Sequence, residues 1–222
     1  MKLDWHEIGT VLLDLDGTLL DLHFDQHFWQ QHLPGCYARK YGLSLQEART
    51  ILLPLFAQME GRLEWYCLDY WSRRLGMDIV NLKAEVEHLI QVHPHVVSFL
   101  QAVRDAGKRV VLTTNADSGS VALKMARTGL ARYFDVMVSA HQLGAPKEES
   151  VFWEYLQERV PFVPQQTLLV DDNLEALSCA RNYGIRYLYA VLRPDSRARK
   201  RGSGHFHAIA DFSEIMPPVE SG

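Results

Sequence analysis

From residue 95 to residue 191 the sequence alternates between stretches with helical spacing and short apolar runs. Such alternation predicts parallel strands joined by right-handed crossovers, with helices on both faces of the sheet. Ligands of such sheets bind beyond the carboxyl ends of the strands. We therefore predict an α/β fold with a Rossmann-like parallel sheet. The predicted strands span 11–13, 109–114, 134–139, 167–170, 186–191 and 207–210, and the predicted helices span 95–106, 118–128, 148–159 and 174–183.

A different kind of sequence separates the first predicted strand from the others. From about residue 25 to residue 91 apolar residues recur at helical spacing, without the pattern of a strand. Breaks fall near Gly42, Gly61 and Gly76, and a helix-capping signature begins at Ser44. We predict three or four helices there, which would sit over the site as a cap. The predicted domains are a catalytic core of residues 1–20 and 93–222 and a helical cap of residues 21–92.

The composition argues against several functional classes. Apolar residues make up 47% of the 222 residues, which is enough for a sizeable core. The net charge is −4 without a basic stripe, and no apolar run is long enough to cross a bilayer, so we predict no binding to nucleic acid or membrane. Cys36, Cys67 and Cys179 are odd in number and widely spaced, as in a reducing compartment. We expect a cytoplasmic protein that is a monomer or a small homo-oligomer.

Two carboxylates stand directly after the first predicted strand. Asp14 and Asp16 can both turn toward one ligand, because Gly17 permits a tight turn behind them. A carboxylate can attack phosphorus and form an aspartyl phosphate. A second carboxyl group can protonate the leaving oxygen and later deprotonate water. The pair therefore predicts phosphoryl-transfer chemistry at this strand end.

Asp171 and Asp172 end a later predicted strand. Four acidic side chains at one pocket repel each other, and a divalent cation removes that penalty. Asp14, the backbone carbonyl of Asp16, and one or both of Asp171 and Asp172 make an all-oxygen ligand set that suits Mg²⁺. The alternative is that one of these acids caps the helix that follows.

Three further candidates give weaker signals. Thr114 and Asn115 end the second predicted strand and could hold phosphoryl oxygens, although an asparagine after a strand is also ordinary turn chemistry. Lys147 precedes a helix and could balance the charge of aspartate and phosphate, although most lysines lie on the surface. These residues are candidates because they lie at the ends of predicted strands and helices, where the ligand of such a sheet is expected.

In this order, the motifs resemble the four signatures of the haloacid dehalogenase-like superfamily, and the likeness covers the whole chain. It implies an α/β core with an inserted helical cap of the C1 type. Carried over residue by residue, it implies that Asp14 is the nucleophile and Asp16 the general acid/base. The other residues implied for the site are Thr114 and Asn115, which would bind the phosphoryl group, Leu15 as a further substrate-binding residue, and Lys147, which would stabilise charge.

The resemblance also bears on the cofactor and on the reaction. Asp172 is the favoured direct ligand of Mg²⁺, with Asp171 binding directly or through water. The second aspartate, Asp16, implies a phosphatase or a phosphomutase and not a dehalogenase, and a phosphatase is favoured. The implied substrate is a small phosphomonoester.

A closer resemblance exists within the superfamily, to bacterial GMP/IMP nucleotidases. It rests on segments 13–22, 28–30, 65–72, 146–148 and 184–187, and it implies hydrolysis of purine 5′-monophosphates to nucleoside and phosphate. One alternative is a phosphatase or mutase for sugar phosphates or phosphoglycolate, but the aromatic-rich cap favours a flat base. A catalytically inactive binding or regulatory relative is the remote alternative, because the charged residues of all four motifs are retained.

Residues 61–75, placed on one helical wheel, offer candidates for binding a base. On this wheel, Glu64 falls on an aromatic face, and Asp69 lies on the opposite side. A carboxylate among aromatic groups is costly unless something pairs with it. We predict that Glu64 or Asp69 accepts a hydrogen bond from a purine ring N–H. Salt bridges to nearby arginines, or exposed surface charges, are the alternative.

Overall fold

Short apolar runs form the six strands of one sheet in the computed structural model, which describes residues 3–218. All neighbouring strands are parallel, in the order β3-β2-β1-β4-β5-β6, so the predicted Rossmann-like α/β fold is confirmed. β1 is central, and all four of its residues are buried. The strands are β1 Thr10–Leu13, β2 Arg109–Thr114, β3 Val136–Ser139, β4 Thr167–Asp171, β5 Tyr187–Val191 and β6 His207–Ile209.

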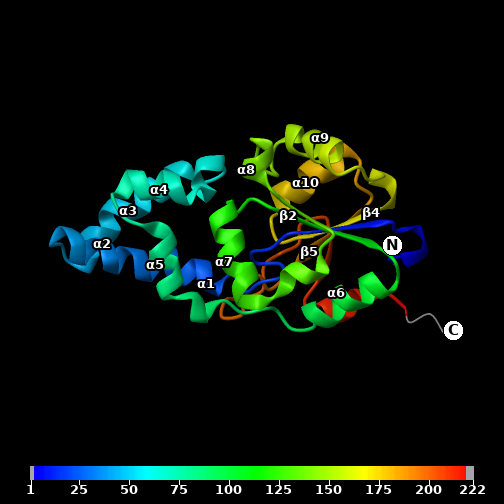
Figure 1. Ribbon diagram of the computed structural model, residues 1–222, viewed down its shortest axis with the longest axis horizontal. Coiled ribbons are helices and arrows are strands. Elements are labelled where there is room, and N and C mark those ends of the chain that lie inside the picture. Colours follow the sequence, from blue (N-terminus) through cyan, green and yellow to red (C-terminus); the bar gives the residue numbers. More distant parts are fainter. Residues whose placement is uncertain (1–2, 219–222) are drawn as a thin grey trace.

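Helices cover both faces of this sheet (Figure 1). Successive side chains of a strand point to opposite faces, so Leu12 packs in the layer of α9 and α10, while Val11 and Leu13 pack in the layer of α6. α7 stands between the sheet and the remaining helices. The helices of this part are α6 Val96–Asp105, α7 Ser118–Thr128, α8 Ala140–Leu143, α9 Ser150–Arg159 and α10 Leu174–Tyr183, with 3-10 turns at Trp5–Glu7, Leu130–Tyr133, Pro164–Gln166 and Phe212–Ile215.

The elements predicted for this part are confirmed, with ends shifted by at most two residues. The third strand begins at Val136 and not at 134, because the chain first forms the 3-10 turn Leu130–Tyr133. This turn is anchored by the buried ring of Tyr133, and the Tyr133 carbonyl accepts a hydrogen bond from Arg104 at 3.1 Å. The short helix α8 was not predicted.

Residues 21–92 form a helical unit beside the sheet, at the left of Figure 1. α1 continues through a π-helical turn into α2, so the five helices amount to four rods, in line with the prediction. Gly42, with a φ of 67°, ends α2, and the predicted capping box between Ser44 and Glu47 opens α3. The helices are α1 His23–His27, α2 Leu33–Tyr41, α3 Leu45–Met59, α4 Leu68–Leu75 and α5 Ile79–Glu85, with the π-helical turn at Phe28–His32 and 3-10 turns at Leu63–Tyr66 and Glu87–Leu89.

The single helix that we assumed over 61–75 is wrong. A 3-10 turn at Leu63–Tyr66 ends in the extended backbone of Cys67, and α4 begins only at Leu68. The N–H of Leu68 donates to Asp117 Oδ2, beside α7, at 2.5 Å. A tertiary hydrogen bond therefore replaces the intrahelical bond that a continuous helix would have made.

Four aromatic side chains form the centre of the helical unit. The ring centroids of Trp29, Phe56, Trp65 and Trp71 lie 5.1 to 5.9 Å apart, mostly in edge-to-face contact, a favourable geometry for aromatic pairs. The Trp71 ring N–H donates to the Trp65 carbonyl at 2.9 Å, which fixes the turn before α4 against α4 itself. Trp29 and Trp65 are only partly buried, so they belong both to this core and to a surface.

The chain enters and leaves the helical unit at adjacent points. Leu20 and Val92 form an antiparallel bridge, Asp21 N–H donates to the Gln91 carbonyl at 2.9 Å, and His93 N–H donates to the Leu19 carbonyl at 2.9 Å. The unit is therefore connected to the sheet through two neighbouring segments.

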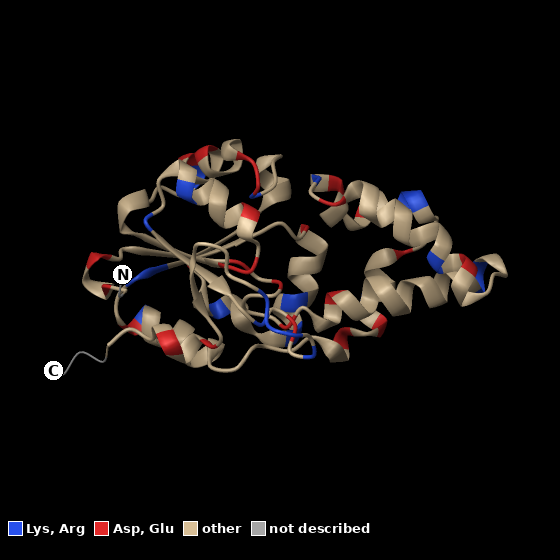
Figure 2. Cartoon of the chain, turned by 180° about the vertical axis from the view of Figure 1, so that it is seen from behind, with Lys and Arg blue, Asp and Glu red and all other residues tan. Residues whose placement is uncertain are grey.

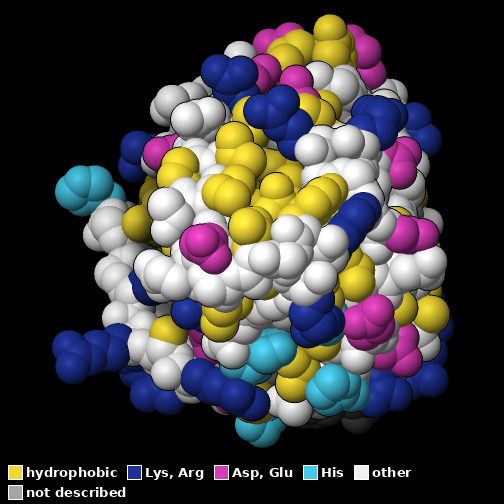
Figure 3. All heavy atoms as spheres, turned by 90° about the vertical axis from the view of Figure 1, so that its left-hand side faces the viewer, with side chains coloured by type: hydrophobic (Ala, Val, Ile, Leu, Met, Phe, Trp, Pro, Cys, Tyr) yellow, Lys and Arg dark blue, Asp and Glu magenta, His cyan; other side chains and the backbone are white. Residues whose placement is uncertain are grey.

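The end of the helical unit farthest from the sheet carries apolar side chains on its surface, among charged groups of both signs (Figure 3). Exposed apolar residues of the unit include Tyr41, Leu45, Ile51 and Leu53. Within residues 3–218, every helix is too short or too polar to span a bilayer.

Candidate active site

The strand order brings the predicted carboxylates to one edge of the sheet. Asp14 follows β1 and Asp171 ends β4, and these strands are neighbours, with Asp14 N–H donating to the Val170 carbonyl at 3.1 Å. Asp14, Asp171 and Asp172 each offer a carboxylate oxygen within 4.8 Å of those of the other two. Acidic positions gather at the strand ends that face the helical unit (Figure 2). This edge is also where the strand connections reverse direction, the usual ligand site of such sheets.

Lys147 is the cation at the centre of this cluster. Its Nζ lies 2.6 Å from Asp14 Oδ1 and 2.6 Å from Asp171 Oδ2, and all three side chains are buried. Burial by itself lowers the pKa of a lysine, but the two carboxylates raise the pKa of Lys147 above its usual range. The backbone of Lys147 is fixed on both sides, because its N–H donates to Asn115 Oδ1 at 3.0 Å and its carbonyl accepts from Trp153 at 3.0 Å.

The cluster has more carboxylates than cations. Burial raises the pKa of Asp171 to about 7 against the opposing effect of Lys147, and burial together with Asp14 and Asp171 raises the pKa of Asp172 well above its usual range. A bound cation would offset the repulsion between these carboxylates. Three carboxylates are hard oxygen donors of the kind that Mg²⁺ prefers. The residues present therefore fit a divalent cation. The Asp16 backbone carbonyl stays a predicted ligand.

Neither Asp171 nor Asp172 caps the next helix, which was the alternative for this pair. Asn173 is the N-cap of α10, where its side-chain oxygen accepts from Glu175 N–H and Ala176 N–H. Asp171 Oδ1 accepts from Asn173 N–H at 2.9 Å, and this bond orients the carboxylate toward Lys147. Both acids are therefore free of capping and available to the cluster.

Gly17 makes room for Asp172. Its φ of 85° is in the left-handed region, and a Cβ at this position would lie 2.7 Å from Asp172 Oδ2. Gly17→Ala is expected to lower the free energy of unfolding by about 1–3 kcal/mol and to lower kcat/KM at least about tenfold, because Asp172 must move.

Gly129→Ala is the matched control, because Gly129 has a φ of 68° but a Cβ at this position would meet no atom within 4 Å. It should show a similar loss of stability in chemical denaturation and retain full activity. Wild-type kcat/KM in Gly17→Ala would contradict this role of the glycine.

Asp16 lies beside the cluster and contacts a different lysine. Its Oδ1 is 2.6 Å from Nζ of Lys124, a buried residue of α7. Burial raises the pKa of Asp16 to about 6, although Lys124 opposes the shift. Sequence reasoning missed Lys124, because nothing local distinguishes it from a surface lysine on a helix.

The remaining predicted residues differ in whether their side chains reach the cavity. Thr114 and Asn115 line the same cavity as the cluster, and Thr114 Oγ1 accepts from Ala116 N–H at 3.1 Å. The side chain of Leu15 is fully buried in the apolar core, so only its backbone is left for substrate binding.

Glu148 is a further residue that sequence reasoning missed. It accepts hydrogen bonds from Asn115 Nδ2 at 2.9 Å, from Asn173 Nδ2 at 2.6 Å and from the Tyr66 hydroxyl at 3.4 Å. These partners come from the ends of β2 and β4 and from the helical unit. Its position directly after Lys147 was the available signal. Glu148 thus connects both strand ends to the helical unit.

A cavity of about 1040 Å³ extends from the carboxylate cluster into the helical unit. The end at the sheet contains the predicted catalytic residues, and the end at the helical unit is aromatic. The cavity is lined at the first end by Asp14, Asp16, Thr114, Asn115, Lys147, Asp171 and Asp172, and at the second by Gln26, Trp29, Gln30, Phe56, Glu60, Trp65 and Tyr66.

The structure does not bring Glu64 or Asp69 into this cavity. Both side chains are exposed and neither lines it, because the chain turns at Cys67 and does not continue as one helix. The aromatic face on which Glu64 was placed therefore does not exist as such. Glu60, at the end of α3, is a carboxylate that does reach the cavity.

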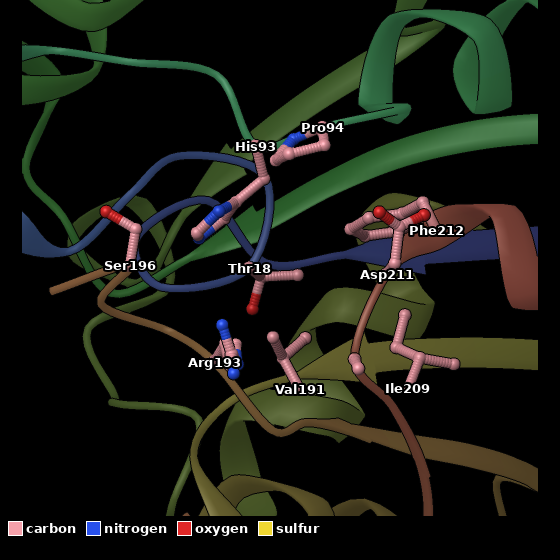
Figure 4. A pocket seen from close by; sticks show the side chains of 10 residues that line it. Thr18, His93, Pro94, Val191, Arg193, Ser196, Ile209, Asp211 and Phe212 are labelled. Carbon is pink, nitrogen blue, oxygen red and sulfur yellow. The ribbon is translucent and has the colours of Figure 1, made fainter. Parts of the chain in front are cut away.

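A smaller cavity of about 210 Å³ opens elsewhere, beside the loop that follows β1 (Figure 4). Thr18, His93, Arg193, Ser196 and Asp211 line it, and it shares no lining residue with the larger cavity. The predicted catalytic side chains thus gather in the larger cavity alone.

The parallel α/β sheet, the lysine-bridged carboxylate cluster and the inserted helical unit agree with the family that the comparison of sequences finds. The model of the haloacid dehalogenase-like hydrolase family matches residues 8–184, and the chain belongs to this family. The GMP/IMP nucleotidase YrfG of Escherichia coli K12 is 36% identical over 219 residues, covering 99% of both chains. A phosphorylated carbohydrates phosphatase of Thermotoga maritima is 22% identical, covering 82% of this chain and 84% of the relative.

Solved structures agree on the architecture. The crystal structure of a phosphatase of the same family from Thermococcus onnurineus superposes with a TM-score of 0.80. Its sequence is 26% identical, and the superposition covers 94% of this chain and 96% of that structure. The similarity therefore includes the sheet and most of the helical unit.

Proposed function

We propose that this protein is a phosphomonoesterase that works through an aspartyl phosphate on Asp14, and that its substrates are purine nucleoside 5′-monophosphates such as GMP and IMP. The observation that carries the proposal is the cavity, which has the Asp14 carboxylate beside the buried ammonium group of Lys147 at one end and aromatic rings at the other. Support for the substrate comes from the similarity to the E. coli GMP/IMP nucleotidase over 99% of the chain.

The residues of the cluster divide the chemistry between them. Asp14 attacks phosphorus, and Asp16 donates a proton to the departing oxygen and then accepts one from the water that hydrolyses the aspartyl phosphate. Lys147 offsets the charge of Asp14 and of the phosphoryl group, which Thr114 and Asn115 bind. Mg²⁺, held by Asp14, Asp171 and Asp172 with the Asp16 carbonyl, would supply the positive charge that draws the phosphate toward Asp14.

The helical unit acts as a cap in this proposal. It closes the cavity opposite the sheet, and the contact between Tyr66 and Glu148 joins the two sides at the cavity wall. Such closure excludes bulk water while the aspartyl phosphate forms. The core of residues 1–20 and 93–222 would then provide the chemistry, and residues 21–92 the choice of substrate.

The far end of the cavity suits a flat, polar-edged group. Trp29 and Trp65 offer aromatic surface for stacking, and Gln26, Gln30 and Glu60 offer groups that can pair with the edge of a base. In this picture the Glu60 carboxylate accepts the N1–H that guanine and hypoxanthine share. Adenine has no N1–H, so its N1 would face the carboxylate as a second acceptor.

Phosphate release from a panel of nucleoside and sugar monophosphates tests the proposal. We expect kcat/KM for GMP and IMP to exceed that for AMP and for hexose phosphates at least about tenfold. A preference for sugar phosphates would retain the chemistry and overturn the substrate. No hydrolysis of any phosphomonoester would overturn the proposed function.

Glu64→Gln and Asp69→Asn are expected to leave kcat/KM for GMP within about twofold of wild type, because both side chains are exposed outside the cavity. Glu60→Gln is the comparison, and it should raise KM for GMP and reduce the discrimination against AMP. Steady-state kinetics with both nucleotides checks this. A specific loss of GMP hydrolysis in Glu64→Gln would contradict the binding of the base between Trp29, Trp65 and Glu60.

A further inference from the structure

A row of four charged side chains, two buried lysines and two partly buried aspartates, runs from the helical unit to the predicted general acid. Lys83 of α5 contacts Asp25 Oδ1 of α1 at 2.7 Å, and Asp25 Oδ2 contacts Lys124 of α7 at 2.7 Å. Lys124 in turn contacts Asp16 Oδ1 at 2.6 Å. Both lysines are almost fully buried, and Asp16, Asp25 and Lys83 also line the large cavity. Of these four residues, the chemistry proposed above uses only Asp16.

When all four groups are ionised, their charges alternate along this row and the set is neutral as a whole. Burial alone would raise the pKa of Asp25, but the ammonium groups of Lys124 and Lys83 lower it to about 2. Nζ of Lys83 also lies 5.2 to 5.7 Å from the ring centroids of Phe24, Phe28 and Trp29. The ammonium group of Lys83, at the outer end of this row of charges, therefore contacts both a carboxylate and aromatic rings.

Stability is a weak reason for such an arrangement. The desolvation of buried ion pairs offsets most of their Coulombic gain, and apolar replacements of similar volume are often as stable. The position of these four residues indicates a different role for them. Asp25 and Lys83 belong to the helical unit, whereas Asp16 and Lys124 belong to the part that contains the sheet.

Lys124 divides its ammonium group between the two parts. It binds Asp16 on one side and Asp25 on the other, at nearly equal distances. We propose that Lys124 is a positioning residue for Asp16, and that Asp25, held by Lys83, makes this positioning depend on the helical unit being closed over the site. The inference rests on the proposed phosphomonoesterase function.

The consequence concerns the leaving group. With Oδ1 of Asp16 bound to Lys124, Oδ2 is the oxygen left for proton transfer. As the bond between Asp14 and phosphorus forms, the bond from phosphorus to the leaving oxygen breaks, and that oxygen takes the proton from Asp16. When the helical unit moves away, Asp25 leaves Lys124 and the second restraint on the ammonium group is lost. Proton donation is thereby tied to closure.

The test compares leaving groups that differ in their need for a proton. An alkoxide leaving from GMP needs protonation, whereas 4-nitrophenolate leaving from 4-nitrophenyl phosphate hardly does. We expect Lys124→Met to lower kcat/KM for GMP about a hundredfold and kcat/KM for 4-nitrophenyl phosphate less than about threefold. Asp16→Asn, measured alongside, gives the selectivity expected when the general acid itself is lost.

A charge-balanced variant addresses the far end of this row of charges. Asp25→Asn combined with Lys83→Met removes one negative and one positive charge, so it leaves no unpaired buried ion and carries the test if Lys124→Met does not fold. It should lower GMP hydrolysis about tenfold, again with little effect on 4-nitrophenyl phosphate. Thermal unfolding establishes that each variant is folded at the assay temperature.

Asp117→Ser tests the dependence on closure without removing any of the four charges. It removes the acceptor of Leu68 N–H across the same boundary, while serine can still cap α7. Because it loosens the helical unit, it should lower hydrolysis of GMP more than hydrolysis of 4-nitrophenyl phosphate, in the same direction as the double variant. Equal losses for both substrates in the charge-balanced double variant, or no loss, would overturn the inference. Failure of wild type to hydrolyse either substrate would instead overturn the proposed function.

Discussion

Lys147→Met is expected to lower kcat/KM for GMP by about two to three orders of magnitude. Without this ammonium group, the buried carboxylates of Asp14 and Asp171 face each other and the incoming phosphate uncompensated. The uncompensated negative charge then repels the anionic substrate.

The same substitution should reduce the free energy of unfolding by about 3–5 kcal/mol in EDTA, since it leaves two carboxylates buried without their partner. Added Mg²⁺ should restore part of that loss, because a bound cation stabilises the folded state in which the carboxylates are close together. Chemical denaturation with and without Mg²⁺ measures both effects. Lys40→Met, at an exposed lysine of the helical unit, is the control. Near wild-type activity in Lys147→Met would contradict its place at the centre of the cluster.

The second large effect is expected from Asp172→Asn. Asp172 lies in the carboxylate cluster, with Arg201 3.4 Å from its Oδ2, and burial together with Asp14 and Asp171 raises its pKa. We expect the Mg²⁺ concentration for half-maximal activity to rise at least about tenfold, because an amide is a weaker ligand than a carboxylate.

A readout apart from activity comes from the stabilisation by Mg²⁺, which should be smaller in Asp172→Asn than in wild type. Asp69→Asn removes an exposed carboxylate outside the cavity and should change neither quantity. If Asp172→Asn responds to Mg²⁺ as wild type does, Asp172 is not a ligand.

The position of the carboxylate cluster could be predicted because it depends on local patterns. Asp14 and Asp171 each end an apolar run, and the alternation of strands and helices places such ends at one edge of a parallel sheet. Lys147 was a weaker candidate, since its ion pairs link residues that are 133 and 24 positions apart. Order along the chain, more than its own surroundings, identified it.

The parts that escaped prediction depend on tertiary contacts. Lys83 and Lys124 resemble surface lysines on amphipathic helices, and only their pairing with Asp25, 58 and 99 positions away, explains their burial. The misplacement of Glu64 has a similar origin, because the hydrogen bond from Leu68 to Asp117 interrupts a helix that the local pattern favours. Periodicity reports a preferred conformation, which distant partners can override.

In the proposed mechanism Asp14 carries the phosphoryl group during turnover. Acid quenching of the enzyme during GMP hydrolysis, followed by proteolysis and mass spectrometry, detects this intermediate directly. We expect the peptide containing Asp14 to gain one phosphoryl group in wild type, and neither this adduct nor phosphate release to occur in Asp14→Asn. Undiminished phosphate release by Asp14→Asn, or a phosphoryl group found on another residue, would rule out Asp14 as the nucleophile.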